Sequence, residues 1–285
     1  MNDAVVYAVA AMFCYGLGDF IYKQSVRAGV RAEHFLAAQA WWYCPLIIVY
    51  ALAVHALVAV RAALWGSLAG LFVFIGLFYF IRSLAIGSVS INASIFRLNF
   101  LITAILAIVL LGEPLTARKI CGLTLGLVGT WLLLGSNDLR GGAPAGAQRR
   151  SIVQVLAAMV AFGTGNFFHA VGLRRGVPPE TLLVAQAIVF MPLATAVVYW
   201  TDRKLPPPPM AFRYGGIAAI LLLGAFVFLL HAVAKGDASI LVPIAQMGFI
   251  VTALLGITLL GETLTVRKAI GLGAALAALA VLASS

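Results

Sequence analysis

The stretch Leu111-Gly-Glu-Pro-Leu-Thr-Ala-Arg-Lys119 occurs twice in the chain, because Leu260-Gly-Glu-Thr-Leu-Thr-Val-Arg-Lys268 repeats it after a shift of 149 residues. Nearer the start of each repeat, Gly16-Leu-Gly-Asp-Phe20 matches Gly163-Thr-Gly-Asn-Phe167 at a shift of 147 residues. Further residues keep one of these two registers, in the pairs Gln39 and Gln186, Pro45 and Pro192, and Thr103 and Thr252. Two apolar sequences share Leu and Ala by chance, but not charged residues and Pro in register. The sequence therefore predicts an internal duplication.

The composition is that of a membrane protein. Of the 285 residues, 63% are hydrophobic and 10% are charged, and the mean hydropathy is +1.07. A soluble domain has about 45–50% apolar and about 25% charged residues. The net charge of +10 comes mostly from short Lys and Arg clusters between apolar blocks, as in loops at a lipid surface. We therefore expect the lipid bilayer, and no nucleic acid, as the partner of these charges.

The apolar blocks predict an all-α, polytopic fold with ten transmembrane helices, since a bilayer core of about 30 Å needs roughly 20 helical residues. They lie near residues 4–22, 35–56, 64–84, 90–111 and 120–134, and near 152–171, 182–200, 214–234, 240–260 and 269–282. Residues 1–135 and 152–285 are predicted to be the two five-helix repeats, with a linker over 136–151. Because five is odd, equivalent helices should run in opposite directions. Such inverted repeats place a binding site at their interface and allow alternating access.

The repeated L-G-E-x-L-T-x-[RK]-[RK] motif, followed by Gly122 and Gly271, resembles the signature of the EamA-type transporters of the drug/metabolite transporter superfamily. The resemblance covers nearly the whole chain as two EamA repeats. It implies a ten-helix metabolite permease, often an exporter, whose first, third, fourth, sixth, eighth and ninth helices surround the substrate cavity. Pro243 matches the proline expected in the ninth helix, whereas Ser94 stands at that place in the fourth. The family is functionally broad, so the resemblance names no substrate.

Arg97 is the leading candidate for substrate binding. It lies about 12 Å into the fourth predicted span, at 1.5 Å per helical residue. An arginine there costs at least about 2.5 kcal/mol on insertion scales unless it faces a wet cavity or a partner. Its repeat equivalent is the neutral Gln246, so the fold as such does not require the charge. We expect Arg97 to hold a carboxylate; the alternative is a structural ion pair.

Asp19 is the second candidate, and it is predicted to serve an amine or a proton. Tyr15 precedes it by four residues, and Tyr22 lies beyond it in the same span. The alternative is a local pair with Lys23, four residues later, whose side chain would extend to the lipid interface. The predicted substrate-binding set is Arg97, Asp19, Tyr15, Tyr22, Asn99, Asn166, His169 and Gln246. Within it, His169 is expected to be a neutral hydrogen-bonding group, since no second metal ligand lies at a usable spacing.

Other polar residues are assigned secondary roles. Arg82 and His231, a repeat pair near span ends, and Lys23 are predicted gating or interfacial residues. Glu113 and Glu262 are predicted to be structural, because each precedes a Thr suited to an N-cap and an Arg-Lys pair. Small residues in the fifth and tenth helices predict close packing within one chain, so a monomer is favoured and a homodimer is the alternative.

No H-E-x-x-H, G-x-S-x-G or P-loop pattern occurs, so no enzyme activity, cofactor, metal or ATP-driven step is expected. The sequence predicts a secondary active transporter, an exporter or exchanger, for a small polar and carboxylate-bearing metabolite such as an amino acid or organic acid. Protons or a counter-substrate would drive it. The alternatives are proton-coupled efflux of cationic or hydrophobic drugs and a non-transporting membrane accessory subunit. We expect a multi-pass protein of a bacterial inner (plasma) membrane; loop charges place both termini outside, whereas the family resemblance implies inside.

Overall fold

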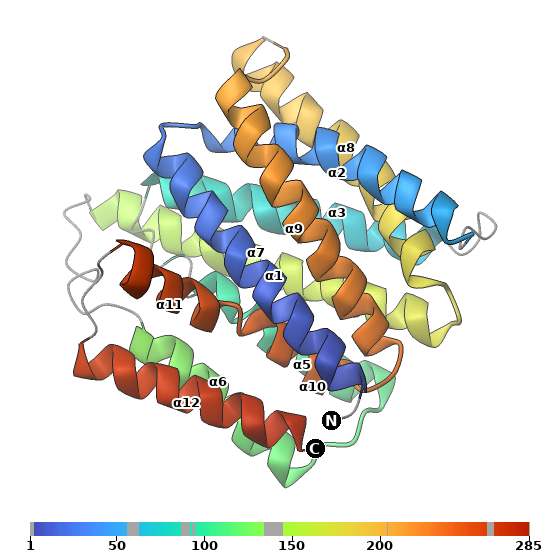
Figure 1. Cartoon of the computed structure of the whole chain (residues 1–285), viewed down its shortest axis with the longest axis vertical. Helices are drawn as coiled ribbons and strands as arrows, with labels where there is room; N and C mark the ends of the chain where they lie inside the picture. Colours follow the sequence, from blue (N-terminus) through green and yellow to red (C-terminus); the bar gives the residue numbers. More distant parts are fainter. Residues whose placement is uncertain are drawn as a thin grey trace.

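The computed structural model describes residues 3–55, 63–86, 92, 95–133, 145–203, 205–260 and 265–284. Within these ranges the regular structure is α-helical (Figure 1). In the first half the helices are α1 (Asp3–Arg27), α2 (Ala32–Ala53), α3 (Ala63–Ile86), α5 (Asn99–Leu111) and α6 (Ala117–Leu133). In the second half they are α7 (Ala145–Arg174), α8 (Pro179–Asp202), α9 (Pro209–Val233), α10 (Ala238–Gln246), α11 (Phe249–Leu260) and α12 (Val266–Ala283).

These helices account for the predicted spans. In the described part of the chain, eight helical segments are long and apolar enough to cross a membrane, and Ile95–Leu111 is a shorter apolar one. Together they coincide with nine of the ten predicted spans, and the span expected at 120–134 corresponds to α6, which has 17 residues. The start of α7 differs most from expectation: the helix begins at Ala145, within the predicted linker. Apart from Gly146, its first residues are Ala, Gln and Arg, which are good helix formers and extend the helix.

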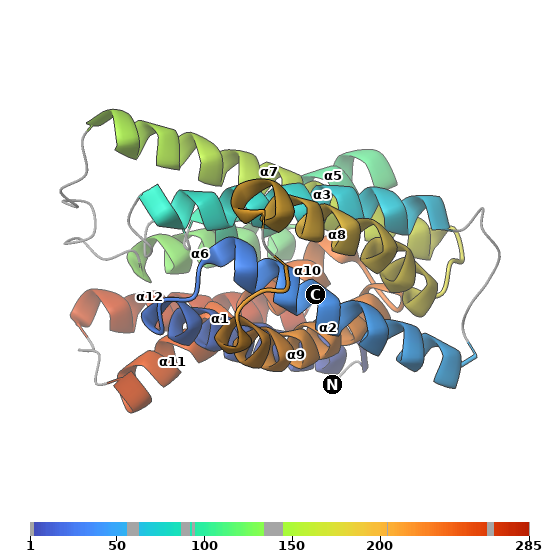
Figure 2. The same ribbon diagram turned by 90° about the horizontal axis from the view of Figure 1, so that it is seen from above.

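Two pairs of packed helices lie on opposite sides of the centre of the molecule. Figure 2 shows α3 and α7 on one side and α1 and α9 on the opposite side. These pairs are equivalent under the repeat, since α1 corresponds to α7 and α3 to α9. In the same way α1 packs against α10 and α11, and α7 packs against α5. The packing therefore follows the duplication.

Glycines at equivalent positions allow the closest of these contacts. A Cβ on Gly16 of α1 would lie 2.4 Å from the carbonyl oxygen of Gly248. A Cβ on Gly163 of α7 would lie 2.6 Å from the carbonyl oxygen of Asn99. Gly248 and Asn99 are themselves equivalent at the shift of 149 residues. The same backbone-to-backbone approach is thus built twice, once in each direction between the repeats.

Equivalent helices also pair with each other, and they run antiparallel. The Arg118 guanidinium at the start of α6 donates to the carbonyl of Ser284, at the end of α12, over 2.8 Å. At the other end, Arg267 donates to the carbonyl of Trp131 over 3.2 Å. Figure 1 shows α6 and α12 lying side by side along one edge. The equivalent helices α6 and α12 therefore run antiparallel to each other.

The close approach of α1 to α10 and α11 yields a prediction. Gly16→Ala and Gly163→Ala should each destabilise the protein by about 1–3 kcal/mol, because the added methyl group overlaps backbone atoms that cannot move freely. The midpoint of thermal unfolding in detergent measures the loss. Gly18→Ala is the matched control, because a Cβ there meets nothing within 4 Å. Equal midpoints for all three variants would contradict this account of the packing.

Candidate functional site

The fourth and ninth predicted spans are both broken, and they break at equivalent residues. One break is a turn at Leu98, whose N–H bonds to the Ile95 carbonyl over 3.1 Å, before α5 begins. The other lies at Met247 and Gly248, between α10 and α11. Pro243 lies inside α10, but the fourth span breaks without a proline at the matching place. The break therefore belongs to the repeat, and helix ends inside a bundle are typical of transporter binding sites.

Arg97 and Gln246 stand next to these breaks and contact each other. The Arg97 guanidinium donates to the Gln246 side-chain oxygen over 3.3 Å. The two residues are equivalent at the shift of 149. The contact therefore joins the first repeat to the second, and we call it the centre of the site.

Asp19 of α1 completes this centre by forming an ion pair with Arg97 through one carboxylate oxygen. The Arg97 side chain is 11% exposed and that of Asp19 is 28% exposed, so the pair is screened from solvent but not sealed. Thr252 of α11 lies on the same side, 3.5 Å from the carboxylate. The structure thus joins Asp19 to Arg97; the side chain of Lys23, the local alternative, lies outside the described residues.

Three further predicted site residues differ in what their side chains contact. Tyr15, one helical turn before Asp19, is buried within electrostatic reach of Arg97, and its hydroxyl has no hydrogen-bond partner in the described protein. The Tyr22 hydroxyl instead donates to the side-chain oxygen of Gln39 in α2 over 2.6 Å. Asn99 is fully buried at the start of α5 and donates to the Phe96 carbonyl. Tyr15 therefore joins the central pair, whereas the contact of Tyr22 is directed to α2 and that of Asn99 is local.

Asn166 and His169 lie on one face of α7, three residues apart, and both are 2% exposed. They line a cavity of about 10 Å³ together with apolar residues of α9 and α10. This volume suffices for about one water molecule. A larger cavity, of about 540 Å³, lies away from the Arg97 pair, between the starts of α1, α6 and α10 and the end of α12.

The predicted gating residues lie farther from the centre. The Arg82 guanidinium is exposed and lies 5.2 Å from the centre of the Phe78 ring. His231, its repeat equivalent, lies with Nε2 3.4 Å from a carboxylate oxygen of Glu180 at the start of α8. The two equivalents therefore have different partners, and only His231 links two helices through an ion-pair geometry.

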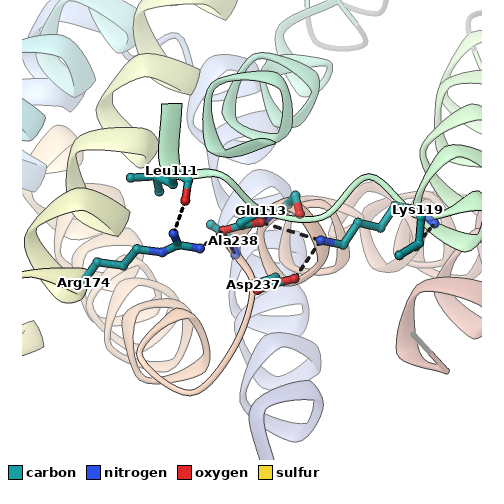
Figure 3. A network of polar contacts seen from close by, with 8 residues as sticks. Leu111, Glu113, Lys119, Arg174, Asp237 and Ala238 are labelled. Atoms are coloured by element: carbon teal, nitrogen blue, oxygen red, sulfur yellow. Dashed lines mark hydrogen bonds and ion pairs between the residues drawn. The ribbon is translucent and has the colours of Figure 1, made fainter. Parts of the chain in front are cut away.

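Glu113 forms a buried network that ties the first repeat to the second (Figure 3). Its carboxylate accepts the N–H groups of Ala238 and Ser239, at the start of α10, over 3.0 and 2.9 Å. Arg174 donates to the same carboxylate over 3.1 Å and also to the Leu111 carbonyl. A carboxylate is favoured at this place because the N-terminal N–H groups of a helix lack partners and carry partial positive charge.

Lys119 extends the network on its other side. Its ammonium group, 2% exposed, lies 3.9 Å from the Glu113 carboxylate and 2.7 Å from that of Asp237. Thr116 caps α6 by accepting the Lys119 N–H over 3.2 Å, and Thr265 caps α12 in the same way. Sequence reasoning anticipated these caps but not that Glu113 would bind the other repeat. Glu262, the second motif carboxylate, lies outside the described residues.

Eight helices among the described residues are long and apolar enough to cross a membrane, which indicates a polytopic membrane protein. The EamA-like transporter family matches the chain twice, over residues 3–135 and over residues 149–284. The chain therefore belongs to the EamA-like transporter family and contains two copies of its repeat. Membership makes it a membrane transporter of the drug/metabolite transporter superfamily.

Two relatives illustrate the duplication and the fold. An uncharacterized protein of Methanocaldococcus jannaschii is 29% identical over 126 residues, which make up 88% of that protein and 43% of this chain. That protein is thus about one repeat long. A crystal structure described only as that of a protein superposes with a TM-score of 0.79 at 18% identity, covering 99% of this chain and 96% of that chain. At this identity the likeness concerns the fold alone.

The buried Glu113 network yields a prediction for stability. Glu113→Gln should destabilise the protein by about 3 kcal/mol, because it removes the buried negative charge that binds Arg174 and the N–H groups at the start of α10, and leaves Lys119 with Asp237 alone. The midpoint of thermal unfolding in detergent would fall accordingly. Glu33→Gln is the control, since this glutamate is partly exposed and lies 3.9 Å from Arg31. A shift no larger than that of the control would show that the network contributes little.

Proposed function

We propose that the chain is a secondary carrier that moves a small polar, carboxylate-bearing metabolite, such as an amino acid or an organic acid, across the membrane. The observation that carries this proposal is the partly exposed Arg97–Asp19 pair, which lies where Arg97 contacts Gln246 of the other repeat. A guanidinium binds a carboxylate through two parallel hydrogen bonds. At the contact between the two repeats, side chains of both halves can reach one solute.

In the proposed mechanism, the carboxylate of the solute displaces Asp19 from Arg97. The freed Asp19 then lies in a screened position without a counter-charge, and such a carboxylate favours a proton or an ammonium group. A zwitterionic solute would supply that ammonium group itself. A monoanionic solute would be accompanied by one proton. In both cases the site stays neutral, which lowers the cost of carrying charge through the bilayer.

Alternating access would follow from the inverted relation of the repeats. The antiparallel pairing of α6 with α12 supports such an inversion, as does the doubled glycine contact of α1 and α7. Rocking of one half against the other around Arg97 would expose the pair to each side in turn. Export or exchange in an inner membrane, driven by protons or a counter-substrate, fits this scheme. Efflux of cationic drugs is disfavoured, because Arg97 repels a cation that approaches Asp19.

The first test removes the guanidinium. In purified protein reconstituted into liposomes, Arg97→Gln should reduce the flux of carboxylate-bearing solutes by between about 10- and 100-fold, the range expected for a lost charged hydrogen bond. Arg175→Gln, an exposed arginine over Trp65, should transport as the wild type does. Unchanged flux of every tested anionic or zwitterionic solute in Arg97→Gln would refute the assignment. The absence of flux with the wild-type chain alone would favour an accessory subunit.

The second test concerns the proton. Asp19→Asn cannot take up a proton after displacement, so a pH gradient should no longer drive accumulation of a monoanionic solute. Exchange of labelled for unlabelled solute should persist, because Arg97 is still present. Asp3→Asn, a change at a carboxylate 80% exposed near the chain start, provides the control. Accumulation driven by protons in Asp19→Asn would assign the coupling to another group.

A further inference from the structure

We propose that a cluster of neutral polar side chains around Phe226, which we call the chamber, receives the uncharged part of the solute, and that it selects carboxylates whose remainder is rich in hydrogen-bonding groups. The chamber is formed by Tyr15, Tyr43, Asn166, His169, Gln186 and Phe226. It is closed in this structure, since the cavity lined by Asn166 and His169 has a volume of about 10 Å³, and a solute must open it on binding. Hydroxylated acids and amide-bearing amino acids are the class it fits, in preference to aliphatic acids of the same charge and length. This inference rests on the proposed function of Arg97.

The geometry of the chamber centres on one ring. Phe226 of α9 is fully buried, and three polar rings from α1, α2 and α7 stand edge-on to it. The ring centres of Tyr15, His169 and Tyr43 lie 6.0, 5.8 and 6.4 Å from that of Phe226. Helices α1, α2, α7 and α9, drawn from both repeats, therefore meet at this point.

Most polar atoms of the chamber are buried but form no hydrogen bond. The hydroxyls of Tyr15 and Tyr43 and the whole amide of Asn166 have no partner in the described protein, and the ring of His169 has none beyond the neighbouring amide of Gln186. The amide of Gln186 lies beside His169, but its oxygen is also unpartnered. Buried polar groups in proteins are nearly always paired, so such a concentration indicates a place where another molecule supplies the partners.

The second repeat shows that the fold does not require these hydroxyls. At the shift of 147 residues, Tyr15 corresponds to Phe162 and Tyr43 corresponds to Phe190. Phe162 and Phe190 pack edge-on against Phe96 and Phe74 in an apolar cluster. The same architecture is thus filled by phenyl rings in one half and by phenols in the other. The phenolic oxygens are an addition to the packing rather than part of it.

The chamber adjoins the charged centre. Tyr15 lies one helical turn before Asp19 on α1, within electrostatic reach of both Arg97 and Tyr43. In the part of the chain that the structure describes, no acid pairs with His169, so the chamber offers donors and acceptors but no fixed charge. A solute whose carboxylate lies at Arg97 would extend its uncharged end toward Tyr43 and His169. A site that must satisfy buried polar atoms discriminates strongly against an apolar analogue.

The experiment compares solutes that differ only in their uncharged part. Binding to the purified full chain would be measured by calorimetry for gluconate against hexanoate, and for glutamine against norleucine. The polar member of each pair should bind more tightly. Tyr43→Phe, which copies the equivalent residue of the other repeat, should reduce that preference by about tenfold. The double variant Tyr15→Phe and Tyr43→Phe should reduce it further.

The controls separate this inference from the proposed function. Tyr79→Phe removes a hydroxyl from an exposed tyrosine of α3 and should leave the preference unchanged. Arg97→Gln should weaken both members of a pair alike and preserve their ratio. Equal binding within the pairs, no binding of any of the four solutes, or an intact preference in the double variant would overturn the chamber. Binding that is indifferent to Arg97→Gln but sensitive to Tyr43→Phe would instead overturn the proposed role of Arg97.

Discussion

The rest of the site depends on one constraint: a guanidinium placed inside an apolar bundle must have a partner. Arg97 has two, the carboxylate of Asp19 and the amide oxygen of Gln246. One partner comes from its own repeat and the other from the opposite repeat. Keeping the charge paired therefore holds α1, α10 and the short helical segment before α5 together at the centre. Any rearrangement of these helices must replace a partner at the moment it is lost.

The breaks in the fourth and ninth spans give this constraint its geometry. A continuous helix presents its side chains along one stripe, whereas a helix that ends in mid-bundle turns its last residues toward the neighbours. Leu98 and Met247 mark the breaks, and the residues just before them are Arg97 and Gln246. The position of the charge at the interface is thus a consequence of where the backbone turns. The paired network of Glu113 fixes the start of α10 and hence one end of this segment.

Much of this architecture could be predicted from the sequence, because duplication and apolar periodicity are properties of the chain itself. The register aligned Arg97 with Gln246, although their contact was not predicted, and the threonine caps follow from local preference. The partners of Asp19 and Glu113 could not be predicted in this way. Helical periodicity tells which face a residue occupies, but not which distant helix lies opposite it. Lys23 was therefore a rival partner for Asp19, and the contact of Glu113 with the other repeat was missed.

The contact between the equivalent residues Arg97 and Gln246 limits how such a protein can be assembled. If two identical single-repeat chains formed the same bundle, whatever stands at residue 97 would face its own copy. An arginine there would oppose a second arginine, and two like charges at that separation repel strongly in a medium of low polarity. Joining both copies in one polypeptide allows arginine on one side and glutamine on the other. Covalent fusion of the two repeats thus allows a single arginine at this contact, with Asp19 as its counter-charge.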